Sequence, residues 1–212
     1  MTKLQLLPYK RYRGVSRDDP IRFYYWPVIG RYYRKRVEMC LDECSGGERV
    51  LEVGFGTGLS FLNLKEKYRE IYGLDLTADI SQVLSTFQGM GLPLHLQNGN
   101  VLHLPFQDNF FDTILLISIL EHLNPSELAA AFQELIRVVK PNGQVVIGVP
   151  VERPFMVVMF RLMGVNIREH HFSTDSDVFK AAAEVMIAKR TLLLQIPLIG
   201  VLYRVGNFQC RQ

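Results

Sequence analysis

From residue 48 onward, short apolar runs alternate with stretches of helical periodicity, and this pattern constrains the fold more than any other feature of the chain. The runs are residues 49–53, 70–74, 94–97, 113–118 and 144–149. Strands that alternate with helical segments are typical of a parallel sheet covered by helices. The sequence therefore predicts an α/β fold, with the sheet as the middle layer of a three-layer sandwich.

The clearest helix is predicted between the last two of these runs. Asn124 can cap its first turn, Pro125 suits the first helical position, and Glu127 stands three residues after the cap. Apolar residues then recur at helical spacing until the Lys-Pro-Asn-Gly sequence at 140–143 ends the helix. This region therefore predicts one amphipathic helix with defined ends.

A second helix and the last part of the sheet are predicted beyond residue 174. The helix is expected near residues 175–187, and the apolar run 191–203 follows it and completes the sheet. Pro197 and Gly200 lie within that run, so they interrupt a strand or mark a turn.

The first 36 residues are basic and aromatic. They hold ten Lys or Arg against two Asp, and eight of the 23 aromatic residues of the chain. Such an arm could lie on phosphate-bearing lipid or nucleic acid, or could cap a pocket. The simpler alternative is a solvated arm whose aromatic side chains pack on the core.

Composition and segment lengths bear on the class of protein. Hydrophobic residues make up 48% and charged residues 21% of the chain, which excludes an intrinsically disordered chain. The longest uncharged apolar stretches, 155–160 and 192–203, are shorter than the roughly 18–20 residues of a membrane span. Three cysteines make no disulfide framework, and no secretory signal is visible. We therefore expect a cytoplasmic protein, with contact at the membrane periphery left open.

A glycine-rich turn directly follows the first apolar run. It reads Gly-Phe-Gly-Thr-Gly at 54–58, and Glu52 stands just before it. Glycines here let the backbone bend sharply and approach a ligand at the carboxyl end of a strand. A carboxylate beside them is unfavourable for a pyrophosphate, and neither G-x-G-x-x-G nor a P-loop motif occurs. The turn therefore predicts a site for a nucleoside-like, cationic ligand without phosphates.

Two further polar residues follow the next two apolar runs. Asp75 can accept hydrogen bonds from both hydroxyls of a ribose, the alternative being a helix-capping or surface residue. Asn100 can recognise an adenine amino group through its side-chain carbonyl, flanked by the backbone of Val101; the alternative is a turn-forming Asn. Because these residues stand at successive strand ends, we expect them to share one site.

The ordered motifs resemble those of the class I S-adenosylmethionine-dependent methyltransferases, especially the small-molecule and lipid branch that includes the quinone-biosynthesis C-methyltransferases. The resemblance spans about residues 48–150 through Leu-Glu-Val-Gly-Phe-Gly-Thr-Gly at 51–58, Gly-Leu-Asp at 73–75, Leu-Pro-Phe at 104–106, Phe-Asp-Thr-Ile at 111–114, Leu-Glu-His-Leu at 120–123 and Arg-Val-Val-Lys-Pro-Asn-Gly at 137–143. It implies an enzyme that uses S-adenosyl-L-methionine, releases S-adenosyl-L-homocysteine and methylates a small, hydrophobic or lipid-like acceptor. It also implies a Rossmann-like, seven-stranded, mostly parallel sheet with one antiparallel strand near its edge.

The resemblance assigns nine residues to cofactor binding. These are Glu52, Gly54, Gly56 and Gly58 at the methionine end, Asp75 at the ribose with the adjacent Leu76, Asn100 and Val101 at the adenine, and Ser118 near the reactive end. Asn100 departs from the Asp that the family usually has at this position.

One domain, residues 1–212, holds all these parts, since a chain of this length fits a single core. We divide it into an N-terminal basic and aromatic arm with a helix (1–47), a cofactor-binding core (48–150), a lid insert (151–175) and a C-terminal helix with strands (176–212). The lid assignment depends on the apolar stretch from Phe155 to Met163, which breaks the alternation and could equally be a buried helix.

The sequence indicates catalytic residues less clearly than it indicates the cofactor site. Methyl transfer is an in-line displacement, so alignment alone can supply about 7–11 kcal/mol and no base is obligatory. If a base is used, His170 and His171 are the candidates, because related enzymes face the acceptor in this region. The alternative is that they cap the next helix and pack the lid.

No metal is predicted. Cys40 and Cys44 are four residues apart on a predicted helix, but no second Cys or His pair completes a ligand set, so buried helix cysteines are the better interpretation.

The acceptor class follows mainly from what the chain lacks. It has neither a Pro-Pro-aromatic nor a Pro-Cys sequence, which disfavours base methylation of nucleic acids. Three alternatives stay open: an RNA methyltransferase that uses the basic arm, a non-catalytic S-adenosylmethionine-binding module, and a nicotinamide-dependent oxidoreductase. The glycine spacing and the absence of a Tyr-x-x-x-Lys pair disfavour the last.

Overall fold

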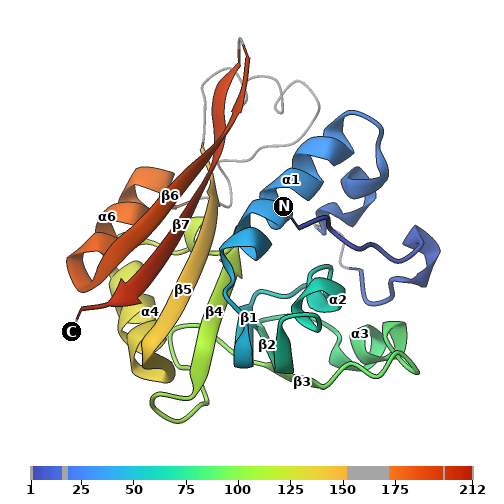
Figure 1. The fold of residues 1–212 in the computed structure, drawn as a ribbon, viewed down its shortest axis with the longest axis horizontal. Coiled ribbons are helices and arrows are strands. Elements are labelled where there is room, and N and C mark those ends of the chain that lie inside the picture. Colours follow the sequence, from blue (N-terminus) through green and yellow to red (C-terminus); the bar gives the residue numbers. More distant parts are fainter. Residues whose placement is uncertain (1, 16–18, 152–171, 198, 212) are drawn as a thin grey trace.

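The computed structural model describes residues 2–15, 19–151, 172–197 and 199–211 of the chain. Its centre is a seven-stranded sheet with the strand order β3-β2-β1-β4-β5-β7-β6 (Figure 1). The strands are β1 Gly47–Val53, β2 Tyr68–Asp75, β3 Leu94–Asn98, β4 Phe111–Ile117, β5 Val139–Pro150, β6 Met186–Ile196 and β7 Gly200–Cys210. All five of the strands expected from the apolar runs are present.

Strand directions match the expected mostly parallel sheet. The neighbours among β1 to β5 pair in parallel, whereas β7 pairs antiparallel with both β5 and β6. Only β7 therefore runs against the others in this sheet, next to the edge strand β6. The run 191–203 divides at Pro197, where the Ile199 amide donates to the Ile196 carbonyl at 3.2 Å and closes a turn between β6 and β7.

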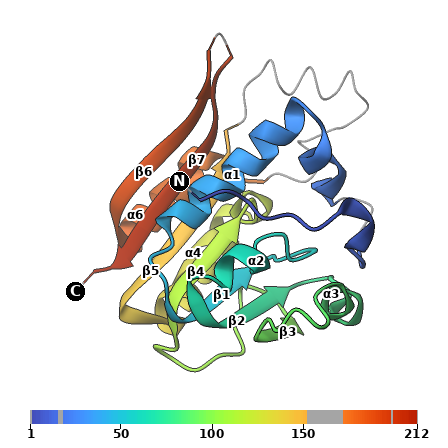
Figure 2. The same ribbon diagram turned by 45° about the vertical axis from the view of Figure 1, so that its right-hand side comes forward.

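Helices cover both faces of the sheet, which confirms the three-layer prediction (Figures 1 and 2). One face carries α4 Pro125–Val138 and α6 Asp175–Val185; the other carries α1 Ile29–Glu43, α2 Phe61–Leu64 and α3 Ile80–Thr86. Short 3-10 helices, η1 Tyr9–Arg11, η2 Pro20–Tyr25 and η3 Leu120–His122, complete the described elements.

Helix α4 begins as its sequence predicts. The Asn124 side chain accepts hydrogen bonds from the amides of Ser126 and Glu127, and the Glu127 carboxylate accepts one from the Asn124 amide at 2.9 Å. This reciprocal arrangement is a capping box, with Pro125 in the first turn. The helix ends at Val138, and β5 begins at the next residue.

Two apolar clusters hold the layers together, one on each face of the sheet. Central strands contribute to both, since a parallel sheet covered on both faces is buried on both faces. On β4, for example, Ile114 and Leu116 pack toward α4, whereas Leu115 packs toward α1, and all three are fully buried.

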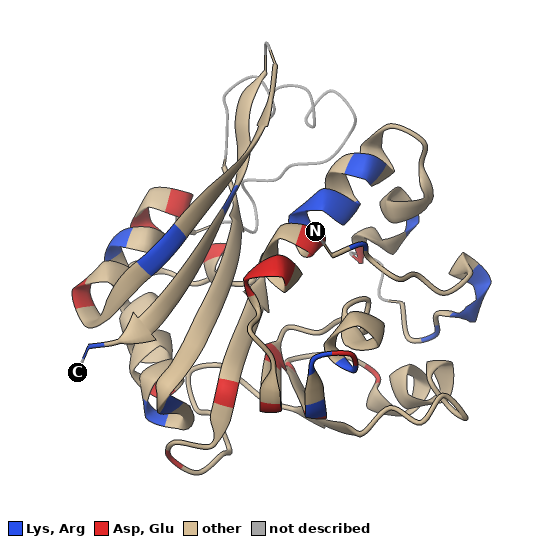
Figure 3. Ribbon diagram, viewed as in Figure 1, with Lys and Arg blue, Asp and Glu red and all other residues tan. Residues whose placement is uncertain are grey.

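The N-terminal arm packs on the α1 face. Its buried apolar side chains are Leu4, Leu7, Tyr12, Ile21 and Tyr24. The Leu4 amide also donates to Glu38 on α1 at 3.0 Å, and the Gln5 amide donates to Asn63 on α2 at 2.9 Å. Packing of the arm on the core is thus confirmed. Its exposed basic residues are Lys3, Lys10, Arg11, Arg13 and Arg22, and Figure 3 marks the Lys and Arg positions along the arm and α1.

The predicted lid insert falls mostly on residues 152–171, which lie outside the described residues. None of the described helices is long and apolar enough to cross a membrane.

Candidate functional site

A cavity of about 290 Å³ lies where the carboxyl ends of β1, β2 and β4 meet. Open α/β sheets bind their ligands at this edge, because the loops that follow neighbouring parallel strands converge there. Five of the nine predicted cofactor residues line the cavity: Glu52, Gly54, Gly56, Asp75 and Ser118. The structure therefore brings together residues from three strand ends that are up to 66 positions apart in the sequence, from Glu52 to Ser118.

The glycine-rich turn after β1 has a backbone that only glycine tolerates well. Gly54, Gly56 and Gly58 all have positive φ angles, of 73°, 52° and 74°. The Gly54 amide donates to the Leu74 carbonyl at 2.7 Å, which holds the turn against β2. A Cβ at Gly54 would come within 2.0 Å of the Ile119 side chain, and one at Gly58 within 2.5 Å of Phe61. Glycine is thus required both for the backbone angle and for close packing.

We expect Gly54→Ala to destabilise the protein and to abolish ligand binding. The left-handed conformation alone costs roughly 1–2 kcal/mol for a non-glycine residue, and the clash with Ile119 adds to that cost. Gly89→Ala is the matched control, because Gly89 has φ 77° and open space around its Cβ. Urea unfolding should show only the backbone cost for Gly89→Ala and a clearly larger loss for Gly54→Ala. Equal losses would mean that Ile119 moves aside freely.

Asp75 holds the glycine turn from the end of β2. Its carboxylate accepts hydrogen bonds from the amides of Gly56 at 2.9 Å, Thr77 at 3.0 Å and Ala78 at 2.9 Å. A carboxylate offers about four lone-pair sites, so it keeps capacity for a ligand hydroxyl. Asp79 and not Asp75 caps α3, so the helix-cap alternative for Asp75 is wrong.

Glu52 is the most perturbed titratable group of the cavity. Burial raises its pKa to about 8; the hydrogen bond from the Ser60 hydroxyl opposes the rise, and the nearby Asp75 carboxylate adds to it. Burial disfavours the charged form of a carboxylate unless a cation compensates it. The environment of Glu52 therefore favours a ligand that brings positive charge.

The N-terminal arm closes the cavity and supplies lining residues that the sequence analysis did not assign. Asp19, Pro20 and Tyr24 come from the arm, and Arg36 and Val37 come from α1. Burial raises the pKa of Asp19, whose carboxylate accepts from the Ile21 amide at 2.8 Å. The composition of residues 1–36 was the available signal: capping a pocket was one of the interpretations it left open.

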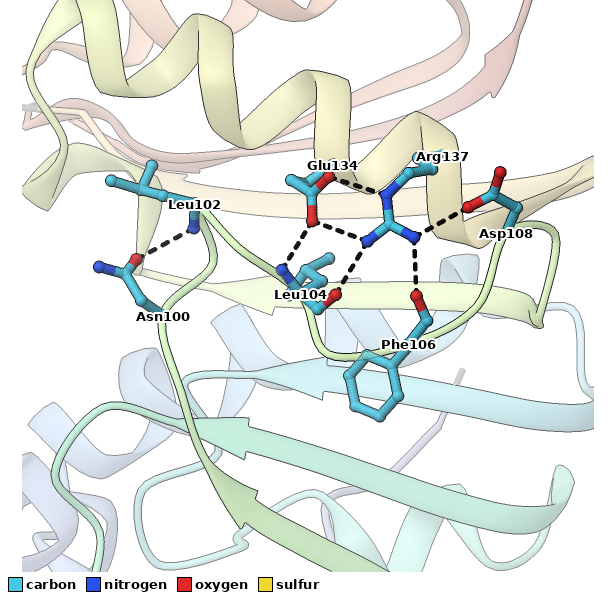
Figure 4. Close-up of polar contacts among 7 residues, drawn as sticks. All are labelled: Asn100, Leu102, Leu104, Phe106, Asp108, Glu134 and Arg137. Atoms are coloured by element: carbon cyan, nitrogen blue, oxygen red, sulfur yellow. Dashed lines mark hydrogen bonds and ion pairs between the residues drawn. The ribbon is translucent and has the colours of Figure 1, made fainter.

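Four predicted cofactor residues do not line the cavity. Gly58 and Val101 are buried, the Leu76 side chain is 68% exposed, and Asn100 is exposed. The Asn100 side-chain oxygen accepts from the Leu102 amide at 3.0 Å, which is the turn-forming geometry (Figure 4). Contacts of these residues with an adenine or ribose therefore stay predictions.

The segment after Asn100 is held by α4. The Arg137 guanidinium donates to the carbonyls of Leu104 and Phe106 at 2.8 and 2.7 Å and pairs with Glu134 and Asp108 (Figure 4). Glu134 in turn accepts from the Leu104 amide at 2.7 Å. This network anchors the loop that carries the Leu-Pro-Phe motif to α4.

Ser118, at the end of β4, is a non-glycine residue with a positive φ angle. Its φ is 58°, its amide donates to the Gly148 carbonyl at 2.8 Å, and its hydroxyl lies 2.9 Å from that of Tyr203. His170 and His171 lie outside the described residues, so their catalytic assignment stays a prediction.

Cys40 and Cys44 are both buried and free, and the Cys44 thiol donates to the Cys40 carbonyl at 3.4 Å. No group of three or more metal-ligating side chains occurs among the described residues.

Comparisons with known proteins relate this chain to methyltransferases. Residues 51–147 match the family described as methyltransferase domain. An uncharacterised protein of Methanocaldococcus jannaschii is 37% identical over 46% of this chain and 39% of its own length. The demethylmenaquinone methyltransferase of Lactiplantibacillus plantarum is 32% identical over 55% of this chain and 50% of its own. This chain thus spans at most half the length of these two relatives.

Among solved structures, the N-methyltransferase NodS of Bradyrhizobium japonicum, in complex with S-adenosyl-l-homocysteine, has the same fold. The TM-score is 0.69 at 15% identity, and the match covers 96% of this chain and 97% of that one. Similarity therefore extends over almost the whole chain at the level of the fold, including the arm and the C-terminal strands.

Proposed function

We propose, from the match of residues 51–147 to the family described as methyltransferase domain, that the protein transfers the methyl group of S-adenosyl-L-methionine to a small, hydrophobic or lipid-like acceptor. One observation carries the proposal: the glycine turn, Glu52 and Asp75 converge on a single cavity at the strand ends. The cofactor is a nucleoside with two ribose hydroxyls, a cationic sulfonium and an ammonium group, and it has no phosphate.

The carboxylates of the cavity fit this cofactor. Asp75 accepts a ribose hydroxyl, while the buried Glu52 and the partly buried Asp19 offer negative potential to cationic groups. A Cβ at Gly56 would stand 3.4 Å from the Asp19 carboxylate, so the turn and the arm approach each other closely over the cavity. Such a cradle suits a flat, extended ligand that the arm then covers.

Bound in this cavity, the cofactor supplies a methyl group on a positively charged sulfur, ready for in-line displacement. The protein has to align the acceptor with that methyl carbon and to keep water out. The arm and α1 serve this purpose, since Tyr24 and Val37 line the cavity. Alignment alone accounts for about 7–11 kcal/mol of barrier reduction. An acceptor that must lose a proton would use His170 or His171 as the base.

The acceptor class rests on the surface of the arm and on the lid stretch 154–165. Tyr9, Trp26 and Val28 are exposed and stand in a basic segment, which suits a cytoplasmic protein that meets an amphipathic acceptor at a membrane surface. The relative that is named demethylmenaquinone methyltransferase supports a lipid-like acceptor. The RNA alternative is disfavoured, because the chain has neither a Pro-Pro-aromatic nor a Pro-Cys sequence.

Calorimetric titration with S-adenosylmethionine, S-adenosylhomocysteine and NAD tests the proposal first. We expect micromolar binding of the two sulfur compounds and no binding of NAD. Labelled methyl transfer to hydrophobic extract fractions, offered in detergent and in anionic vesicles, then tests the acceptor class. Binding without transfer to any fraction would favour the non-catalytic module, and binding of NAD alone would overturn the proposal.

A further inference from the structure

The arm carries a run of exposed apolar side chains where it meets α1. Residues 25–28, Tyr-Trp-Pro-Val, are all exposed, and the exposed fractions are 43% for Trp26 and 81% for Val28. Tyr9 is also exposed, and its ring centre lies 5.5 Å from that of Tyr25, so η1 brings residues 8–11 beside this run. Exposed apolar side chains that gather in this way are typical of an interaction surface.

Exposed cations accompany this apolar run. They are Lys10, Arg11, Arg22 and Arg31. Among the described residues 2–15 and 19–37, Asp19 is the only acidic one, and it is partly buried and lines the cavity. We call residues 8–11 and 25–28, together with Arg22 and Arg31, the arm surface. It is apolar and aromatic at its centre, and its charges are positive.

The order of charges along α1 is the reverse of the order that stabilises a helix. Its basic residues lie at 31–36 and its acidic residues at 38–43, whereas the helix dipole favours acidic side chains at the N-terminus. Figure 3 shows this order, with the blue segments of α1 toward the arm and the red ones at its other end. The helix itself therefore does not explain the cations at this end, whereas a negatively charged partner does.

The 3-10 helix η2 has one side on the arm surface and the other on the cavity. Ile21 and Tyr24 are buried, and Tyr24 lines the cavity together with Pro20. Arg22 is exposed, and the exposed Trp26 directly follows the helix. The same short helix thus contributes to the arm surface and to the cavity wall, which places the two next to each other.

We propose that the arm surface docks the protein on an anionic lipid bilayer, with its cations at the lipid phosphates and with Trp26 and Val28 in the apolar part of the interface. Clusters of Lys and Arg are attracted to acidic headgroups, and tryptophan favours the headgroup level because its ring is apolar and its N–H is polar. RNA fits less well, since an exposed aliphatic side chain such as Val28 gains little from phosphates or stacked bases. The inference rests on the proposed function only for its purpose, which is to bring the cavity to an amphipathic acceptor.

The fluorescence of Trp26 tests this docking in the parent protein, since Trp26 is the only tryptophan of the chain. We expect a blue shift with vesicles of phosphatidylcholine and phosphatidylglycerol, and quenching when the acyl chains are brominated. Vesicles of phosphatidylcholine alone and single-stranded polyuridylate should leave the spectrum unchanged. An unchanged spectrum with the anionic vesicles would overturn the proposal, and a response to polyuridylate in its place would indicate a nucleic-acid surface.

Cosedimentation with the same anionic vesicles assigns the docking to particular side chains. The double variant Lys10→Gln, Arg11→Gln should bind about fivefold more weakly for each cation removed, and high salt should also weaken binding of the parent. Val28→Ser should bind severalfold more weakly, because it removes apolar surface from the interface. It should keep its stability in urea unfolding, since Val28 holds the N-cap position of α1, where Ser is a favoured residue.

The matched control lies at the start of the edge strand β6, away from the arm in both views (Figures 1 and 2). It combines Ile187→Ser with Lys189→Gln, and both of these residues are exposed. This double variant should bind the vesicles as the parent does. An equal loss in the β6 variant and in the arm variants would overturn the proposal, because it would mean that the vesicles attract basic and apolar side chains wherever they lie.

Calorimetric titration with S-adenosylhomocysteine, without vesicles, separates this inference from the proposed function. The arm and β6 variants should bind it as the parent does, because none of the substituted residues lines the cavity. Vesicle binding without binding of S-adenosylhomocysteine would overturn the proposed function and support the docking surface. The reverse result would overturn the docking surface alone.

Discussion

Asp75→Ala should weaken the binding of S-adenosylmethionine by at least about 100-fold. The variant removes the acceptor for a ribose hydroxyl, and a hydrogen bond to a charged group is worth about 1.5–3 kcal/mol. It also leaves the amides of Gly56, Thr77 and Ala78 without their acceptor, so the glycine turn loses its anchor to β2. Both effects act on the same ligand. Calorimetric titration at equal protein concentrations measures the loss.

Asp79→Ala is the control for this variant. Asp79 caps α3 by accepting from the Gln82 amide at 3.1 Å, and it does not line the cavity. Loss of such a cap costs about 0.5–2 kcal/mol, so both variants should lose some stability in urea unfolding. Only Asp75→Ala should lose affinity. If it bound the cofactor as tightly as the parent, the placement of the ribose at the end of β2 would be wrong.

Local chemistry explains why much of the fold could be predicted. The capping box at Asn124 and the glycine turn at 54–58 each depend on residues that are only a few positions apart. A short stretch of sequence is therefore enough to predict them. The central strands β1, β4 and β5 of the parallel part follow from apolar runs that are largely buried on both faces, whereas the edge strand β3 has no buried residue. Asp75 lines the cavity for the same reason, since a polar residue at the end of a buried strand faces the ligand-binding edge of the sheet, and its contact with a ribose stays a prediction.

Long-range packing explains what the sequence did not reveal. Asp19 lies close to the glycine turn. Arg36 contacts Tyr203 on β7, which is more than 160 positions away in the sequence. No local sequence pattern predicts such contacts. One antiparallel strand near the sheet edge was expected only from the resemblance, and the place of β7 between β5 and β6 was not predicted, because a turn at Pro197 would allow either strand of the hairpin to join the sheet. At Asn100 the turn-forming geometry is present, since its side-chain oxygen accepts from the Leu102 amide, and its contact with an adenine stays a prediction.

Glu52→Gln should abolish tight cofactor binding and at the same time stabilise the protein above neutral pH. The pKa of Glu52 is raised by burial to about 8, whereas an exposed Glu titrates near 4.5. The folded protein therefore holds a proton that the unfolded chain releases between these two values. Stability from the protonated carboxyl is fully present below about pH 4.5 and is lost as the pH rises through 8. Glutamine does not ionise, so the stability of the variant should not fall in this way as the pH rises.

Urea unfolding at pH 5.5 and 8.5 measures this difference. Each pKa difference of one corresponds to about 1.4 kcal/mol, so the advantage of Glu52→Gln over the parent should grow to several kcal/mol at the higher pH. Glu48→Gln is the control: Glu48 is exposed and its ion pair with Arg69 at 3.4 Å is a surface contact, so its stability should follow the parent at both values.

Cofactor affinity should depend on pH in the opposite direction. A cationic ligand favours the ionised carboxylate, so binding to the parent releases a proton below pH 8, and affinity should rise by up to about tenfold per pH unit before it levels off near that value. Titration in two buffers of different ionisation enthalpy would detect the released proton. Glu52→Gln should show neither the pH dependence nor the proton release. Equal, pH-independent affinity of parent and variant would place the cationic part of the cofactor elsewhere in the cavity, because only a group next to Glu52 can recover the energy that burial of its carboxylate costs.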